Sequence, residues 1–104
     1  MARAVIDAGV CGHITEVETE VGEKFIVKIK ICSSGEGIRR LAAELSEVDA
    51  LQEISFRKTP PEILAKGAQF CSHASCPVPA GIIKAVEVAA GLALPKDVSI
   101  KLEK

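Results

Sequence analysis

Two neighbouring stretches of the chain alternate between apolar and charged residues with the period of a β-strand. Residues 14–21 oppose Thr15, Val17, Thr19 and Val21 to Glu16, Glu18 and Glu20, and residues 25–31 oppose Phe25, Val27, Ile29 and Ile31 to Lys28 and Lys30. A three-residue turn over 22–24 would pair Val17 with Ile29 and Glu18 with Lys28, with all apolar residues on one face. The pattern predicts an antiparallel hairpin in that register, with its charged face in solvent.

Two further strands are expected near the ends of the chain. A short β-branched stretch, residues 3–8, predicts a first strand that ends at Gly9. Near the C-terminus, Val98, Ile100 and Leu102 alternate with Ser99, Lys101 and Glu103. This predicts a last strand with one face in the core.

A helical period follows the hairpin. Residues 33–36 read as a capping box, with Ser33 as N-cap and Glu36 at N3. The apolar stripe of the helix that follows runs from Ile38 to Val48. Asp49 can cap a second, short helical piece over residues 50–54.

The second half of the chain predicts two more helices. After a polar link over residues 55–58, the run Thr59-Pro60-Pro61-Glu62 is a helix start, with proline at N1 and Glu62 reaching back. This helix runs out near Phe70, and a loop over residues 71–79 leads to a third main helix over residues 80–92.

This order of elements, β-β-β-α-α-α-β, predicts an α+β fold for one domain, residues 1–104. The final strand must pair with the opening strands to bury its apolar face. We therefore expect a two-layer sandwich, with an antiparallel-rich sheet of about four strands and helices on one face. An open sheet edge would make a homodimer a candidate assembly, because dimers commonly use such edges.

Composition narrows the possible partners. The net charge is −1 and the only aromatic residues are three phenylalanines, so the sequence offers neither a basic patch nor the Tyr and Trp platforms on which nucleic-acid bases stack. No apolar run is long enough for a bilayer span or a signal peptide. We therefore expect a cytoplasmic protein that binds neither nucleic acid nor membrane, and whose four cysteines are reduced.

Reactive side chains concentrate in the segment Cys71-Ser-His-Ala-Ser-Cys-Pro-Val-Pro. Cys71, His73 and Cys76 have the spacing Cys-x-His-x-x-Cys, and thiolates with an imidazole suit Zn²⁺ or an iron–sulfur cluster. A fourth ligand must come from elsewhere, with Cys11 or His13 on a glycine-flanked turn as candidates. The predicted metal site consists of Cys11, Cys71, His73 and Cys76.

Two other interpretations of the cysteines stay open. Cys71 and Cys76 could be small buried hydrophobes in an interaction or accessory module that binds an unidentified protein. Alternatively, Cys76 precedes a helix, whose dipole favours its thiolate, and Cys32 precedes the first helix likewise, which would suit redox or nucleophilic chemistry. Cys32 falls on the charged side of its strand and is only an additional candidate thiol. No hydrolytic constellation is present, so an enzyme is the less favoured reading.

Four segments of the chain resemble a known family. These are Val5-Ile6-Asp7-Ala8-Gly9-Val10-Cys11-Gly12, Glu47-Val48-Asp49-Ala50-Leu51, His73-Ala74-Ser75-Cys76-Pro77-Val78-Pro79 and Gly91-Leu92-Ala93-Leu94-Pro95-Lys96-Asp97-Val98. They resemble a family of small proteins of unknown activity from anaerobic bacteria and archaea. This chain departs from the family pattern where Ser33 replaces a proline and His13 an aromatic residue.

A more distant resemblance rests on Cys32, the helix after it, and Ala74-Ser75-Cys76-Pro77 at the start of a later helix. These features look like the TSCPD domain, which is attached to some cobalamin-dependent ribonucleotide reductases. The spacing from Cys71 to Cys76 is shorter here than in that domain. The resemblance implies an accessory module that carries thiols or a metal.

Overall fold

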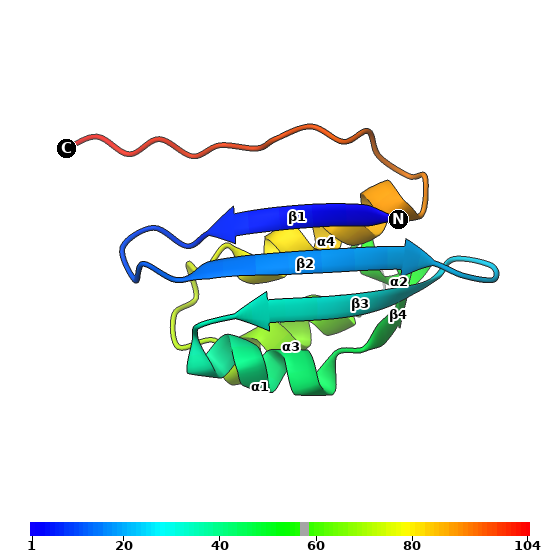
Figure 1. Ribbon diagram of the computed structural model, residues 1–104, viewed down its shortest axis with the longest axis horizontal. Helices are drawn as coiled ribbons and strands as arrows, with labels where there is room; N and C mark the ends of the chain where they lie inside the picture. The colour runs from blue at the N-terminus through cyan, green and yellow to red at the C-terminus, as the bar shows by residue number, and fades with distance from the viewer. Residues whose placement is uncertain (57–58) are drawn as a thin grey trace.

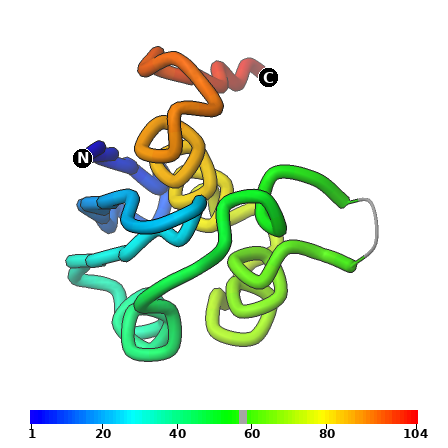
Figure 2. Tube along the Cα trace, turned by 90° about the vertical axis from the view of Figure 1, so that its right-hand side faces the viewer, coloured from blue at the N-terminus to red at the C-terminus, as the bar shows by residue number. Residues whose placement is uncertain are grey.

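The computed structural model describes residues 1–56 and 59–104, and within them one antiparallel sheet lies against a layer of helices. The strands are β1 (Ala2–Asp7), β2 (Ile14–Val21), β3 (Ile26–Ser33) and β4 (Glu47–Asp49), in the order β1-β2-β3-β4. The helices are α1 (Glu36–Glu44), α2 (Ala50–Glu53), α3 (Glu62–Phe70) and α4 (Val78–Ala89), all on one face of the sheet (Figures 1 and 2). The predicted α+β sandwich is confirmed. Of the predicted link over residues 55–58, positions 57 and 58 lie outside the described residues.

The core forms between the sheet and the helices. Every second side chain of β2 points into this core. Val17 is fully buried beneath the helices, together with Thr15 and Thr19, while the glutamates between them face solvent. The hydroxyl of Thr19 donates to the carbonyl of Ala85 in α4, at 2.9 Å. This bond satisfies a polar group that would otherwise be costly to bury, so β2 and α4 are tied together as well as packed.

The register of the hairpin differs from the prediction by two residues. Val17 pairs with Ile31, and Glu18 with Lys30. The last paired residues are Val21 and Val27, so the connection between them covers residues 22–26, and the N–H of Gly22 donates across it to the carbonyl of Ile26 at 2.7 Å. A slip of two residues keeps every side chain on its own face. The predicted faces are therefore right although the predicted pairs are wrong.

The first helix is shorter than predicted, and its last expected turn is a strand. Helix α1 ends at Glu44, and Val48 lies in β4, where it pairs with Val27 and is buried. The two valines meet on the helix-covered side of the sheet, where a β-branched residue packs well. The predicted short helix after it is confirmed as α2, with the Asp49 carboxylate accepting from the N–H of Leu51 at 3.0 Å.

The predicted capping box at the start of α1 is wrong. Ser33 is the last residue of β3, and its hydroxyl accepts from the N–H of Gly35 at 3.2 Å and from the hydroxyl of Thr15 at 2.9 Å. Gly35 is the N-cap, and Glu36 opens the helix with an ion pair to Arg40 at 3.0 Å. Ser33 therefore does not cap α1. It stabilises the turn between β3 and α1, which sets the direction of the helix.

The predicted last strand is not part of the sheet. The C-terminal segment, residues 92–104, has no regular secondary structure and runs in an extended path beyond β1 (Figure 1). Val98, Ile100 and Leu102 are 64%, 78% and 88% exposed. The fourth strand is instead β4. The sequence did not predict it, because Val48 also fits the apolar stripe of the preceding helix. Within the described residues, no helix is long and apolar enough to cross a membrane.

Candidate thiol site

Every cysteine and histidine of the chain lies in or beside a connection at the same end of the sheet. We name it the cysteine end. It contains the β1–β2 turn with Cys11 and His13, the end of β3 with Cys32, and the α3–α4 loop with Cys71, His73 and Cys76. Figure 1 shows these connections together on the left of the molecule. The topology thus gathers the predicted ligands at one end, although they are far apart in sequence.

The α3–α4 loop holds its two cysteines through backbone hydrogen bonds at both ends. The N–H of Cys71 donates to the carbonyl of Gly67 at 2.8 Å, which closes the last turn of α3. The N–H of Cys76 donates to the carbonyl of His73 at 3.2 Å and makes the chain reverse. Pro77 is the N-cap of α4, which begins two residues earlier than predicted because its prolines fit the first turn.

The two thiols of this loop interact with each other. Both side chains are half-buried and pack against the core. Partial burial, the charge of a Cys76 thiolate and a hydrogen bond with Cys76, in decreasing order of effect, together raise the pKa of the Cys71 thiol to about 11. In the metal-free protein Cys71 is therefore a protonated thiol at neutral pH. It is not a preformed nucleophile, because only the thiolate is strongly nucleophilic.

Close backbone packing fixes the position of the loop. A Cβ atom added to Gly37 in α1 would lie 2.5 Å from the carbonyl oxygen of Phe70, and one added to Gly67 in α3 would lie 2.6 Å from Cγ of Pro79. Both distances are shorter than a Cβ atom tolerates. Only glycine lets α1 meet the end of α3, and α3 meet the start of α4. These contacts hold both sides of the loop that carries the thiol pair.

The other thiols and imidazoles at this end have different surroundings. Cys11 is exposed on a turn whose Gly9 and Gly12 adopt positive φ angles of 85° and 75°. His13 is half-buried, and its Nδ1 hydrogen-bonds the hydroxyl of Ser34 at 2.9 Å. That bond ties the β1–β2 turn to the start of α1 and gives His13 a structural role. Cys32 is exposed on the open face of the sheet, opposite Glu16.

The structure brings together two of the four predicted ligands. Cys71 and Cys76 interact, His73 lies exposed between them in the same loop, and Cys11 lies exposed on the β1–β2 turn. Across residues 1–56 and 59–104, no group of three or more His, Cys, Asp or Glu side chains is arranged to hold a metal ion. The site as it stands is a thiol pair, with the exposed side chains of Cys11 and His73 at the same end of the sheet.

A protein-family model of unknown function, DUF6951, matches residues 2–102, almost the whole chain. The chain belongs to this family. No curated protein and no solved structure matches it significantly. Membership of DUF6951 agrees with the predicted resemblance to a family of unknown activity. It assigns no chemistry to the cysteines, so the function has to be argued from the site.

In this DUF6951 member, one important polar residue escaped the sequence analysis. Glu53 at the end of α2 is 3% exposed, and its carboxylate accepts from the N–H groups of Glu62 and Ile63 at 3.0 and 2.7 Å. These are the first amides of α3, where a negative charge is favoured. The predicted cap by Glu62 itself is absent. The available signal was a proline-opened helix without a Ser, Thr, Asp or Asn at its N-cap, which requires an acceptor from elsewhere.

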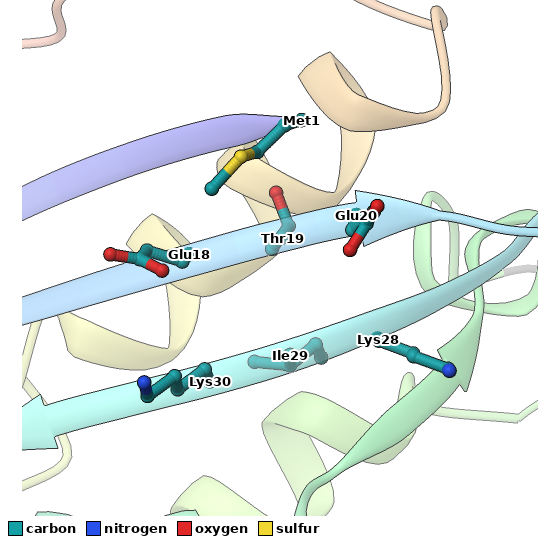
Figure 3. A pocket seen from close by; sticks show the side chains of 7 residues that line it. All are labelled: Met1, Glu18, Thr19, Glu20, Lys28, Ile29 and Lys30. Atoms are coloured by element: carbon teal, nitrogen blue, oxygen red, sulfur yellow. The ribbon is translucent and has the colours of Figure 1, made fainter.

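The face of the sheet opposite the helices carries a shallow hollow of about 160 Å³ between β2 and β3 (Figure 3). Glu18 and Glu20 line it from β2, and Lys28 and Lys30 from β3. The ladder pairs each of these glutamates with one of the lysines, so the charges balance across the hollow. We therefore place the candidate site at the thiol pair rather than here.

Proposed function

We propose that this chain is a small module that binds a soft metal ion, Zn²⁺ or the iron of an iron–sulfur cluster, through the thiolates of Cys71 and Cys76. The observation that carries the proposal is the contact between these two half-buried thiols at the ends of one backbone-fixed loop. A metal site needs ligands held close to their bound positions by rigid elements. The glycine-mediated packing around α3 supplies that support.

Metal binding explains how a thiol that resists ionisation could still be functional. The metal-free Cys71 thiol keeps its proton because it is partly buried and lies beside Cys76. A divalent cation reverses this preference, since it neutralises the two thiolates and displaces their protons. Binding should therefore release protons and weaken as the pH falls.

His73 and Cys11 are the proposed ligands that complete the site. His73 lies two residues after Cys71 in the same loop, and its imidazole is exposed. Cys11 is exposed on a turn at the same end of the sheet. Together with the thiol pair they form a Cys₃His set, which is common in structural zinc sites. The resemblance to the cysteine-bearing TSCPD domain supports an accessory module of this kind rather than a complete enzyme.

The test is the metal content of protein purified without oxygen, combined with cysteine variants. We expect either about one equivalent of zinc, which is colourless, or the two to four iron atoms of about one cluster, which absorbs at about 400 nm. Cys71→Ser and Cys76→Ser should each lose the metal. Cys32→Ser is the matched control and should retain it, because Cys32 is exposed on the opposite face of the sheet. Folded wild-type protein that retains neither zinc nor iron after dialysis contradicts the proposal.

The same thiol contact favours a second candidate, a reversible disulfide between Cys71 and Cys76. A small-molecule or protein disulfide would be the oxidant: it gains two electrons and two protons and leaves as two thiols, while one S–S bond forms in the loop. Mass spectrometry after equilibration with a glutathione redox buffer tests this. A Cys71–Cys76 disulfide in metal-free protein supports the redox candidate. Protein that binds no metal and forms no such bond has cysteines that only pack.

A further inference from the structure

The C-terminal segment has the pattern of a strand but pairs with no strand among the residues that the structure describes. Val98, Ile100 and Leu102 alternate with Ser99, Lys101 and Glu103, and all three apolar side chains are more than half exposed. An apolar face of this kind is stable only when another surface covers it. From residue 94 to the C-terminus the segment runs in an extended path (Figure 1), which is the conformation that strand pairing requires.

The edge strand β1 offers a place where such a segment could pair. In residues 1–56 and 59–104 the strand order is β1-β2-β3-β4, so β1 pairs with β2 alone and its other edge is open. The helix-facing side chains of β1 next to that edge, Ala4 and Ile6, are only half-buried. Ala89 and Ala90 at the end of α4, which packs under β1, are half-buried as well. One more strand beyond β1 would cover these apolar atoms and satisfy the open backbone groups.

The direction of the segment distinguishes its own edge from that of another molecule. In Figure 1 both β1 and the C-terminal segment run from right to left, so pairing within one chain would be parallel. All three existing ladders are antiparallel. A parallel pair is slightly less stable per residue and is normally buried on both faces, whereas an antiparallel sheet tolerates one open face like this one. No backbone hydrogen bond joins the segment to β1 within the described residues.

We propose that residues 97–103 form a β-strand that pairs antiparallel with β1 of a second copy of this chain, and that the second copy returns the same contact. A two-fold axis makes this exchange reciprocal and closed, so the product is a dimer rather than a fibre. Val98, Ile100 and Leu102 would then continue the apolar layer of Ala4 and Ile6. The proposal does not depend on the proposed metal site.

The test combines light scattering with hydrogen exchange of the full chain. We expect wild-type protein at twice the monomer mass, with slowly exchanging amides in both β1 and residues 97–103. Ile100→Asp should raise the dissociation constant at least tenfold, because it places a charge in the new apolar layer. It should abolish the protection of residues 97–103 and of the β1 amides on the open edge, while the β1 amides that bond β2 stay protected. The control Ser99→Asp places the same charge on the solvent side and should remain dimeric.

Three outcomes would overturn the proposal. A monomeric wild type with protected residues 97–103 would show that the segment pairs with its own β1. A monomer without that protection would show that the segment has no strand partner. A dimer that Ile100→Asp leaves intact would use another interface. Unchanged protection of β2 in the variant verifies that its fold is preserved, which we expect because Ile100 is 78% exposed.

Discussion

The two ends of the sheet use their polar side chains differently. At the end formed by β4, α2 and the start of α3, the carboxylates of Asp49 and Glu53 each cap a helix. At the cysteine end, the thiols of Cys71 and Cys76 interact with each other and pack against the core, and Cys11 and His73 are exposed. No buried side-chain nitrogen or oxygen lacks a hydrogen-bond partner within the described residues.

This difference distinguishes side chains that stabilise the fold from side chains that are free to bind a ligand. Both oxygens of the Glu53 carboxylate accept hydrogen bonds from amides of α3, so this side chain has a structural role. The two thiols do not hold their loop in place in this way. Backbone hydrogen bonds and close packing at glycines fix the loop instead. Substitutions at the first end should therefore cost stability without changing metal binding, while thiol substitutions should remove metal binding at a smaller cost in stability.

The largest expected effect is that of Glu53→Ala. The variant leaves two helix-terminal amides without their buried charged acceptor, which we expect to lower the free energy of unfolding by about 3 kcal/mol. Urea denaturation measures this loss, and exposed Glu44→Ala is the control, with less than about 0.5 kcal/mol expected. Metal content of the folded variant should be unchanged. A loss of unfolding free energy no larger than that of the control would show that Glu53 does not stabilise the fold.

Gly37→Ala should have a smaller effect that reaches the cysteine end. The new methyl group would lie 2.5 Å from the carbonyl oxygen of Phe70, so α1 and the end of α3 must separate. We expect a net destabilisation of about 1–2 kcal/mol despite the better helix propensity of alanine, and weaker metal binding because Phe70 precedes Cys71. Gly22→Ala is the control, since its Cβ would make an ordinary contact at 3.6 Å. A stabilised Gly37→Ala variant with wild-type metal affinity would contradict the packing argument.

The smallest effect is a pH dependence of the metal-free protein. The pKa of Cys71 rises from 9.0 to about 11 on folding, so the folded state holds a proton that the unfolded chain releases first. This contribution to stability is complete below pH 9 and falls as the pH rises toward 11. Urea midpoints between these pH values should fall more steeply for wild type than for Cys71→Ala. Parallel curves would show that the Cys71 environment does not change its ionisation.

The sequence predicted the layers of the fold better than its connections. Alternation in residues 14–31 identified the buried face of the hairpin, because burial selects every second residue whatever the register. It could not distinguish a connection over residues 22–24 from the observed connection over residues 22–26, between the paired Val21 and Val27. It also could not distinguish the end of a helix from β4, because Val48 fits both an apolar helical stripe and a strand opposite Val27.

For the candidate site, the sequence located the loop but not its geometry. The spacing of Cys71 and Cys76 before a proline-opened helix identified the thiol pair, since local turn chemistry places both ends of that loop. The positions of Cys11 and His13 depend on how the β1–β2 turn meets α1, which no local pattern encodes. The bond from His13 to Ser34 joins residues 21 apart in sequence. Glu53 caps a helix that starts 9 residues later, and is hidden for the same reason.

The most direct test of the metal-binding proposal is the alkylation of each cysteine with and without Zn²⁺, measured by peptide mass spectrometry at one reducing pH. We predict that stoichiometric Zn²⁺ protects Cys71, Cys76 and Cys11 from iodoacetamide, while Cys32 reacts at the same rate in both samples. A chelator should restore reactivity at the protected positions. Labelling of Cys71 and Cys76 that is as fast with Zn²⁺ as without it would contradict the account.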